Sequence, residues 1–382
     1  MKHWKVFLLA GVICLVSLAG CGGQAEEDIC SWANVGAIAE TEDSWLYFIG
    51  NQLSIWSKEE DGEPEPWCGK EQCMHTSETS CPAIMYHKFI NTLAVDRDYA
   101  YIAGLEEGRL FLYRMGLKEK AVSLERWTQL EEVSALYCSV ESLEVNGNWY
   151  YLLGTAGEDQ NFTWTLGAVE LKDGSQKTIY TAEAGESLEN LKVYGGQIYV
   201  CSWMGEESRL ICLDQDGKKE EILPEAVYSY AVKDGLLYYS GEKPGIWRKN
   251  LKTGEKECWI SGEESWMGIS WDGKYWYADN YNSVRLFPGD ETDVEKLNLM
   301  NRRILVYDEN GGKVDEIRAD SIAGECLFGG PDALVITQGE GGMYYLLFDK
   351  SQIGQERDNS SQEKIRAQYR AMDYPYSGAG TG

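Results

Sequence analysis

Short runs of apolar, aromatic and β-branched residues recur along this chain, and most of them end in a turn rich in Gly, Asp or Asn. Residues 230–260 show the pattern clearly, with runs at 230–233, 236–240, 246–250 and 255–260. Asp234-Gly235 and the 251–254 segment have the composition of tight turns between antiparallel strands. The pattern predicts a four-stranded antiparallel meander, which is the size of one blade of a β-propeller.

Comparable units follow one another through most of the chain. They begin near residues 45, 92, 142, 191, 230, 268 and 326. The turn before the fourth run ends in a glycine in four of them, at Gly174, Gly217, Gly254 and Gly311. An all-β fold is therefore expected, a propeller of about seven blades over residues 37–350. Six blades remain an alternative because the last unit is fragmentary. Residues 351–382 are polar and are expected to form a C-terminal tail, with a short helix at 362–372.

Composition supports a packed, aromatic-rich fold. Hydrophobic residues make up 43% of the chain and aromatic residues 12%, which is enough for a core and argues against disorder. The formal net charge is −27. Such a surface repels phosphate backbones, so nucleic acid is not an expected partner.

The first residues have the features of an export signal. Lys2 and Lys5 precede an apolar run that is too short to span a bilayer, and Leu18-Ala-Gly-Cys21 follows it. This arrangement resembles the signal of bacterial lipoproteins, in which the cysteine is lipidated. The resemblance implies a signal peptide at 1–20, a lipid (palmitate) on Cys21 and a tether over 21–36. The protein would then be anchored at the extracytoplasmic face of the cell membrane. The alternative is an ordinary signal peptide with a coincidental cysteine.

In a four-stranded meander, the loops between the second and third strands lie on the same face as the links between blades. In this chain those loops are rich in acidic residues, with aromatic residues beside them. The candidate binding-face residues are Glu106, Glu107, Glu158, Asp159, Trp203, Glu206, Glu207, Glu242, Asp279, Tyr281 and Glu340. One interpretation is a face that binds a cation, a basic peptide, an amino sugar or a partner protein. The other is a solvated surface in a chain that is acidic throughout.

A cluster of sulfur ligands lies in the expected link between the first and second units. Cys68, Cys73, His75 and Cys81 fall within 14 residues. They could form a Cys₃His set for zinc. Two of the cysteines could instead form a disulfide that holds the loop, which the expected compartment permits, and free thiols are the third alternative.

The lipoprotein signal, the first unit and this cysteine loop together resemble uncharacterised β-propeller lipoproteins of Gram-positive, Clostridia-type bacteria. Those proteins look like the propeller of low-density-lipoprotein-receptor-related proteins. Tyr275-Trp-Tyr-Ala-Asp279 is similar to the Tyr-Trp-Thr-Asp motif of that propeller, with one inserted residue and Ala in place of Thr. The resemblance implies fold and location, and no catalytic residue.

Little in the sequence indicates an enzyme. After removal of the signal only His75 and His87 could serve a catalytic triad. Ser240-Gly-Glu-Lys243 matches the Ser-x-x-Lys signature, but it lies between strands where that signature needs a helix. We therefore expect a ligand- or protein-binding scaffold without an identified catalytic residue. A metal- or redox-responsive accessory protein is one alternative, and a carbohydrate-active propeller enzyme that uses the acidic loops is the other.

Overall fold

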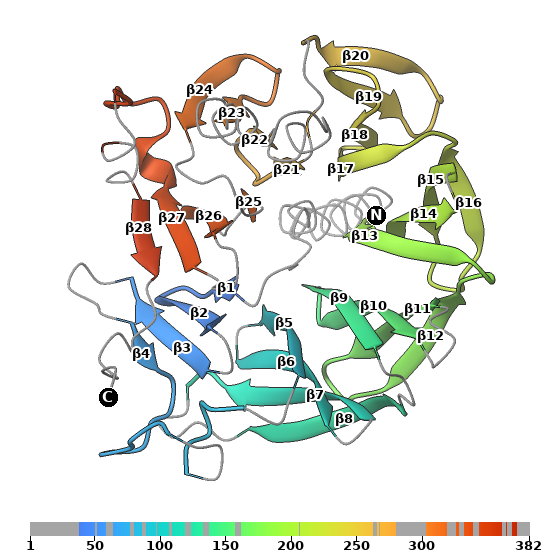
Figure 1. Ribbon diagram of the computed structural model, residues 1–382. Coiled ribbons are helices and arrows are strands. Elements are labelled where there is room, and N and C mark those ends of the chain that lie inside the picture. The colour runs from blue at the N-terminus through green and yellow to red at the C-terminus, as the bar shows by residue number, and fades with distance from the viewer. Residues whose placement is uncertain are drawn as a thin grey trace, which may run out of the picture.

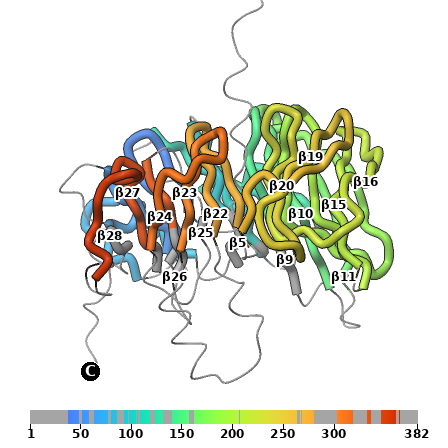
Figure 2. Tube along the Cα trace, turned by 90° about the horizontal axis from the view of Figure 1, so that it is seen from above, coloured from blue at the N-terminus to red at the C-terminus, as the bar shows by residue number. Residues whose placement is uncertain are grey.

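The computed structural model describes residues 38–49, 52–58, 64–76, 80–85, 89–96, 98–106, 109–118, 124–132, 137–156, 162–205, 207–262, 266, 268–279, 303–318, 326–327, 332–338, 344–360, 364 and 369–372. These residues form seven four-stranded sheets arranged in a ring (Figure 1). Figure 2 shows the same ring edge-on, as a disc. The chain is a β-propeller, and the expected all-β fold with about seven blades is confirmed.

Each blade takes four consecutive strands in chain order, and every pair of neighbours is antiparallel. The strands of blades 1 to 4 are β1 (Ile38–Glu40), β2 (Ser44–Ile49), β3 (Gln52–Ser57), β4 (Glu65–Pro66), β5 (Phe89–Val95), β6 (Tyr99–Glu106), β7 (Arg109–Gly116), β8 (Glu125–Glu132), β9 (Tyr137–Val145), β10 (Asn148–Ala156), β11 (Phe162–Glu170), β12 (Gln176–Thr181), β13 (Glu186–Tyr194), β14 (Gln197–Met204), β15 (Glu207–Leu213) and β16 (Lys219–Leu223). Those of blades 5 to 7 are β17 (Val227–Lys233), β18 (Leu236–Gly241), β19 (Ile246–Asn250), β20 (Lys256–Ile260), β21 (Gly268–Trp271), β22 (Trp276–Asp279), β23 (Arg303–Tyr307), β24 (Lys313–Arg318), β25 (Cys326–Leu327), β26 (Ala333–Gln338), β27 (Tyr344–Asp349) and β28 (Tyr369–Met372). A short 3₁₀ helix, η1 (Lys350–Gln352), follows β27.

The period of two along each strand explains how the ring is packed. In β2, Trp45 and Tyr47 pack with blade 7, whereas Leu46 and Phe48 pack with blade 2. Both faces of a blade are therefore buried against its neighbours, which is why the strands are rich in large apolar residues on both sides. A hydrophobic cluster of this kind lies between each pair of adjacent blades in the described part of the ring.

The ring closes without a shared strand among the described residues. Blade 1 contains only β1–β4, and blade 7 contains only β25–β28. The two blades meet through side chains: Trp45 and Tyr47 on one side, and Val335 and Leu347 on the other. The Lys58 ammonium also lies 2.8 Å from the Asp332 carboxylate. We call this contact between blades 1 and 7 the closing seam.

The segment expected to form a tail contributes to the propeller. β28 pairs with β27, so the fourth strand of blade 7 comes from beyond residue 350, and residues 369–372 are a strand where the sequence predicted a helix. The physical reason is that β27 has an open edge whose N–H and C=O groups need partners.

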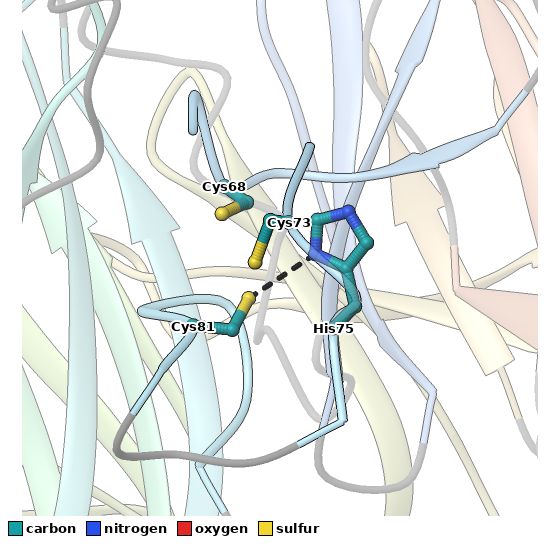
Figure 3. A group of neighbouring side chains, drawn as sticks. All are labelled: Cys68, Cys73, His75 and Cys81. Carbon is teal, nitrogen blue, oxygen red and sulfur yellow. Dashed lines mark hydrogen bonds between the residues drawn. The ribbon is translucent and has the colours of Figure 1, made fainter. Parts of the chain in front are cut away.

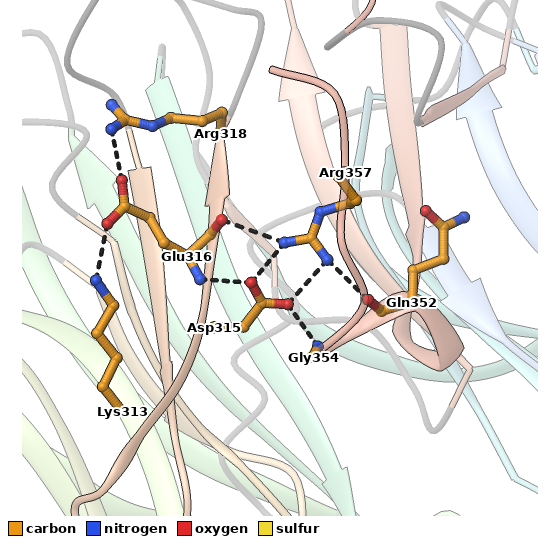
Figure 4. Close-up of polar contacts among 7 residues, drawn as sticks. All are labelled: Lys313, Asp315, Glu316, Arg318, Gln352, Gly354 and Arg357. Carbon is orange, nitrogen blue, oxygen red and sulfur yellow. Dashed lines mark hydrogen bonds and ion pairs between the residues drawn. The ribbon is translucent and has the colours of Figure 1, made fainter. Parts of the chain in front are cut away.

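Residues just after β27 are also held in place. The Arg357 guanidinium contacts both oxygens of Asp315 in β24, at 2.8 and 2.6 Å (Figure 4). The Gly354 amide donates to the same carboxylate at 2.7 Å. Burial acts to raise the pKa of Asp315, but the hydrogen bonds from Arg357 and the backbone outweigh it and hold that pKa below its usual range. This contact attaches the segment that follows β27 to blade 6.

Candidate functional site

The cysteine loop is fixed at both ends by blade 1. Cys68 follows β4, and its amide donates to the Pro66 carbonyl at 2.8 Å. At the other end, the Leu53 amide of β3 donates to the Ala83 carbonyl at 2.9 Å, and Ile84 forms an isolated bridge with Gln52. The positions of Cys68 and Cys81 are therefore set by backbone contacts with the sheet.

The loop between these ends turns tightly and brings in the other two side chains. Gly69, Gln72 and His75 all have positive φ, at 66°, 58° and 49°. Only glycine adopts this region without a steric cost, so two non-glycine residues here mark a strained turn. The Lys70 ammonium donates to the Ser80 carbonyl at 2.8 Å and spans the loop.

The four predicted ligands converge. The side-chain ligand atoms of Cys68, Cys73, His75 and Cys81 all lie within 4.8 Å of one another (Figure 3). His75 Nδ1 is 3.2 Å from Cys81 Sγ. In a tetrahedral zinc site with Zn–S bonds of 2.3 Å the sulfurs are about 3.8 Å apart, so small side-chain movements would complete such a site. This Cys₃His group could hold a metal ion.

The burial of these four side chains is more typical of a metal centre than of a solvent-exposed loop. Cys68 and Cys81 are fully buried and pack with Ala83 and Ile84, while Cys73 and His75 are half-buried. A hydrogen bond from the His75 backbone lowers the pKa of Cys73, and burial raises the pKa of Cys81 to about 12. The two thiols thus differ in environment although they are neighbours.

No disulfide is present among the described cysteines. Cys68, Cys73, Cys81, Cys201, Cys212 and Cys258 are all free thiols. The expected disulfide bond is therefore not found in the described part of the chain. The reason is geometric, because three sulfurs and an imidazole surround one point instead of two sulfurs pairing off. Cys201 and Cys212 are buried between blades 4 and 5, where they pack as small apolar residues, whereas Cys258 in β20 is exposed although the same role would be expected of a strand cysteine.

The predicted acidic face is only partly described. Glu107, Glu158, Asp159, Glu206, Tyr281 and Glu340 lie outside the described residues, as does Cys21 with the signal segment. Asp279 ends β22 and is 2% exposed, so it is not part of an exposed face. Glu207 is exposed at the start of β15.

Other members of this face already have partners in the protein. Glu106 accepts a hydrogen bond from the Tyr113 hydroxyl at 2.5 Å and pairs with Arg126 at 2.8 Å. The Trp203 indole donates to Glu189 at 2.5 Å. Glu242 is exposed and lines a small pocket of about 100 Å³ beside Trp247. The described residues therefore do not form one continuous acidic site.

Comparisons with known proteins agree with the fold and add no family. No family model matches the chain, and no curated protein matches it. A prolyl endopeptidase structure is similar over 92% of this chain and 53% of its own, with 12% identity and a TM-score of 0.53. A puromycin-hydrolysing peptidase of Mycobacterium tuberculosis is similar over 81% of this chain and 50% of its own, with 13% identity and a TM-score of 0.50. The chain thus spans about half the length of these peptidases, and at such identities the likeness supports the propeller fold alone.

Within the residues that the structure describes, no helix combines the length and the apolar character needed to cross a bilayer.

Proposed function

We propose that this protein is a lipid-anchored, extracytoplasmic β-propeller that acts as a binding scaffold, and that zinc holds the link between blades 1 and 2. The observation that carries the metal assignment is the convergence of three sulfurs and one imidazole nitrogen within 4.8 Å. The anchor rests on the basic start, the apolar run and the Leu-Ala-Gly-Cys21 box. The likeness to Clostridia-type propeller lipoproteins belongs to the same proposal.

The ligand set favours a structural role for the metal. Cys68, Cys73, His75 and Cys81 would fill all four positions of a tetrahedral ion, which leaves none for water or substrate. Sulfur-rich sites favour zinc over hard cations such as Mg²⁺ or Ca²⁺. Bound zinc would therefore fix the loop on the face that carries the blade links, and a scaffold role needs such a rigid face.

The test uses the mature chain purified without chelator, with zinc and free thiols measured on the same sample. About one zinc per chain is expected, with the thiols of the loop reactive only after chelation. Cys73→Ser and His75→Gln should lose the metal, whereas Cys258→Ser should retain it because Cys258 is exposed and outside the cluster. Absence of zinc together with two thiols that react only after reduction would establish a disulfide and contradict the metal assignment.

The anchor is tested separately. The full-length protein expressed in a bacterial host should partition into detergent and incorporate labelled fatty acid. Cys21→Ala should abolish both, because the thiol carries the lipid in the proposal. A labelled Cys21→Ala protein, or an unlabelled parent protein, would contradict the lipid anchor and leave the metal assignment intact.

A further inference from the structure

A cleft of about 610 Å³ opens where blades 1, 6 and 7 meet. Its size is in the range of small-molecule sites. It lies at the closing seam and on the opposite face of the ring from the metal centre. The two ends of β3 lie on these opposite faces. Gln52 at the start of β3 forms the bridge with Ile84, next to the cysteine loop, whereas Lys58, just after the end of β3, lines the cleft.

Two lysines in the cleft occupy a position that is leucine in three other blades. In five blades, the residue after the third strand donates its amide to a carbonyl of the first turn. That residue is leucine in blades 2, 3 and 5, and lysine in blades 1 and 7. The five bonds join Leu117 to Asp98, Leu171 to Gly147, Leu251 to Gly235, Lys58 to Asp43 and Lys350 to Asp332. The repeat therefore accepts leucine here, and among these five blades only blades 1 and 7, which both line the cleft, have lysine.

Both lysines are largely buried and already paired. Lys58 Nζ lies 2.7 Å from Glu40 and 2.8 Å from Asp332, and Lys350 Nζ lies 2.9 Å from Asp272. Their side chains are only 16% and 7% exposed. A charged ligand that bound at Lys58 or Lys350 would have to compete with these ion pairs, at the cost of leaving a buried charge without its partner. A neutral ligand avoids that cost.

The groups around the cleft favour hydroxyls and an apolar ring face. An ammonium donates hydrogen bonds and a carboxylate accepts them, and a hydroxyl can bond to both kinds of group without breaking the pair. Tyr275, which is half-buried, places an aromatic ring at the same cleft, and such a ring packs against flat apolar surfaces. We propose that this cleft binds a neutral saccharide, held by the Lys58 and Lys350 ion pairs and by the ring of Tyr275.

This site deepens the proposed binding role and does not depend on the metal centre. A saccharide there would contact both ends of the ring and would stabilise the closing seam. Loss of zinc and loss of saccharide binding are thus separate outcomes.

The experiment titrates the mature protein with maltotriose, cellotriose and triacetylchitotriose by calorimetry, up to millimolar concentration. Saturable binding of at least one of them is expected, together with a rise in melting temperature. The glucosamine trimer is the cationic counterpart of triacetylchitotriose. It should bind more weakly than triacetylchitotriose. A trialanine amide serves as the peptide control.

Tyr275→Ala removes the aromatic contact in the cleft, and Tyr99→Ala is its matched control. Both tyrosines are half-buried and follow the same aspartate turn, but Tyr99 lies in blade 2, away from the cleft. Tyr275→Ala should weaken binding by about tenfold, as expected for the loss of one aromatic contact, and Tyr99→Ala should leave binding unchanged. The proposal is overturned if no neutral trisaccharide binds, if the peptide binds as well as the sugars, or if the two variants bind alike.

Discussion

Blades 2 and 6 contain the same turn, but only the turn in blade 6 holds a lysine of the next blade. Asp96 and Asp272 each accept two backbone amides and one tyrosine hydroxyl, from Tyr101 at 2.9 Å and from Tyr277 at 2.6 Å. Asp272 also pairs with Lys350 of blade 7. The backbone repeat thus fixes where the turn lies, and the residue that the neighbouring blade presents decides its electrostatic role.

Burial and charge compete at Asp272. Burial acts to raise its pKa, but the charge of Lys350 and the hydrogen bonds from Tyr277, Lys350 and Tyr275 outweigh that effect and hold the pKa below its usual range. Lys350 in turn lies near the face of the Tyr277 ring, 5.3 Å from its centroid. The closing seam therefore combines buried charges with aromatic packing, whereas the contact of blades 2 and 3 is largely apolar and aromatic.

The largest effect is expected from Asp272→Ala. It leaves the buried Lys350 ammonium without its carboxylate, which should lower the free energy of unfolding by about 3–5 kcal/mol. Asp96→Ala removes the equivalent turn and tyrosine bonds and should cost about 1–2 kcal/mol. Urea unfolding of the two variants measures the difference. Equal losses would mean that the lysine contributes nothing at the seam.

Arg357→Ala should have the next largest effect. It removes the paired contact with Asp315, whose side chain is 11% exposed, and should cost about 2–3 kcal/mol. Hydrogen exchange should increase in β24 and η1, because this contact attaches the segment that follows β27 to blade 6. Arg318→Ala is the control, since its contact with Glu316 is more exposed and should change stability by about 0–1 kcal/mol.

A pH experiment tests a buried charged contact that lies away from the closing seam. In blade 4, Glu186 accepts bonds from Ser202 at 2.5 Å, from Tyr180 at 2.6 Å and from Lys219 at 2.9 Å. Burial acts to raise its pKa, but these bonds outweigh that effect and lower it to about 2. The unfolded value is about 4.3, so the stabilisation is complete above that pH and is lost as the pH falls toward 2.

Glu186→Gln should therefore reduce the pH dependence of unfolding between about pH 5 and pH 3. The free energy of unfolding from urea titrations at several pH values gives the slope. A slope equal to that of the parent protein would show that Glu186 is not the group that titrates.

The smallest effect is expected from Asp332→Ala. Asp332 is 61% exposed although it pairs with Lys58, and exposed ion pairs contribute about 0–1 kcal/mol. Glu40, only 5% exposed, remains as a partner for Lys58. A loss much greater than this range in thermal unfolding would indicate that the Lys58–Asp332 pair itself holds the ring closed.

Much of the fold could be predicted from local sequence patterns. The alternation in β2 indicates a strand with two apolar faces, and the repeated turns give the blade length. The cysteine ligands were also accessible, because all four lie in one short loop whose ends are near each other. β28 was not predicted, because its four residues mix polar and apolar side chains. So short a segment gives no strand pattern that can be distinguished from a helix.

The cleft could not be predicted in this way. Lys58 and Lys350 look like ordinary lysines that follow a strand, and only their alignment with Leu117, Leu171 and Leu251 would have marked them. That alignment depends on knowing the register of each blade, which the sequence pattern leaves uncertain by a few residues.

By itself, the sequence determined the features that depend on neighbouring residues: the strands, the turns, the blade repeat and the Cys₃His spacing. Only the tertiary structure decided how the ring closes. Lys58 and Asp332 are 274 positions apart and meet because seven blades complete a circle. Strand alternation and turn chemistry act over a few residues, whereas the pairing of buried charges depends on which blades become neighbours in space.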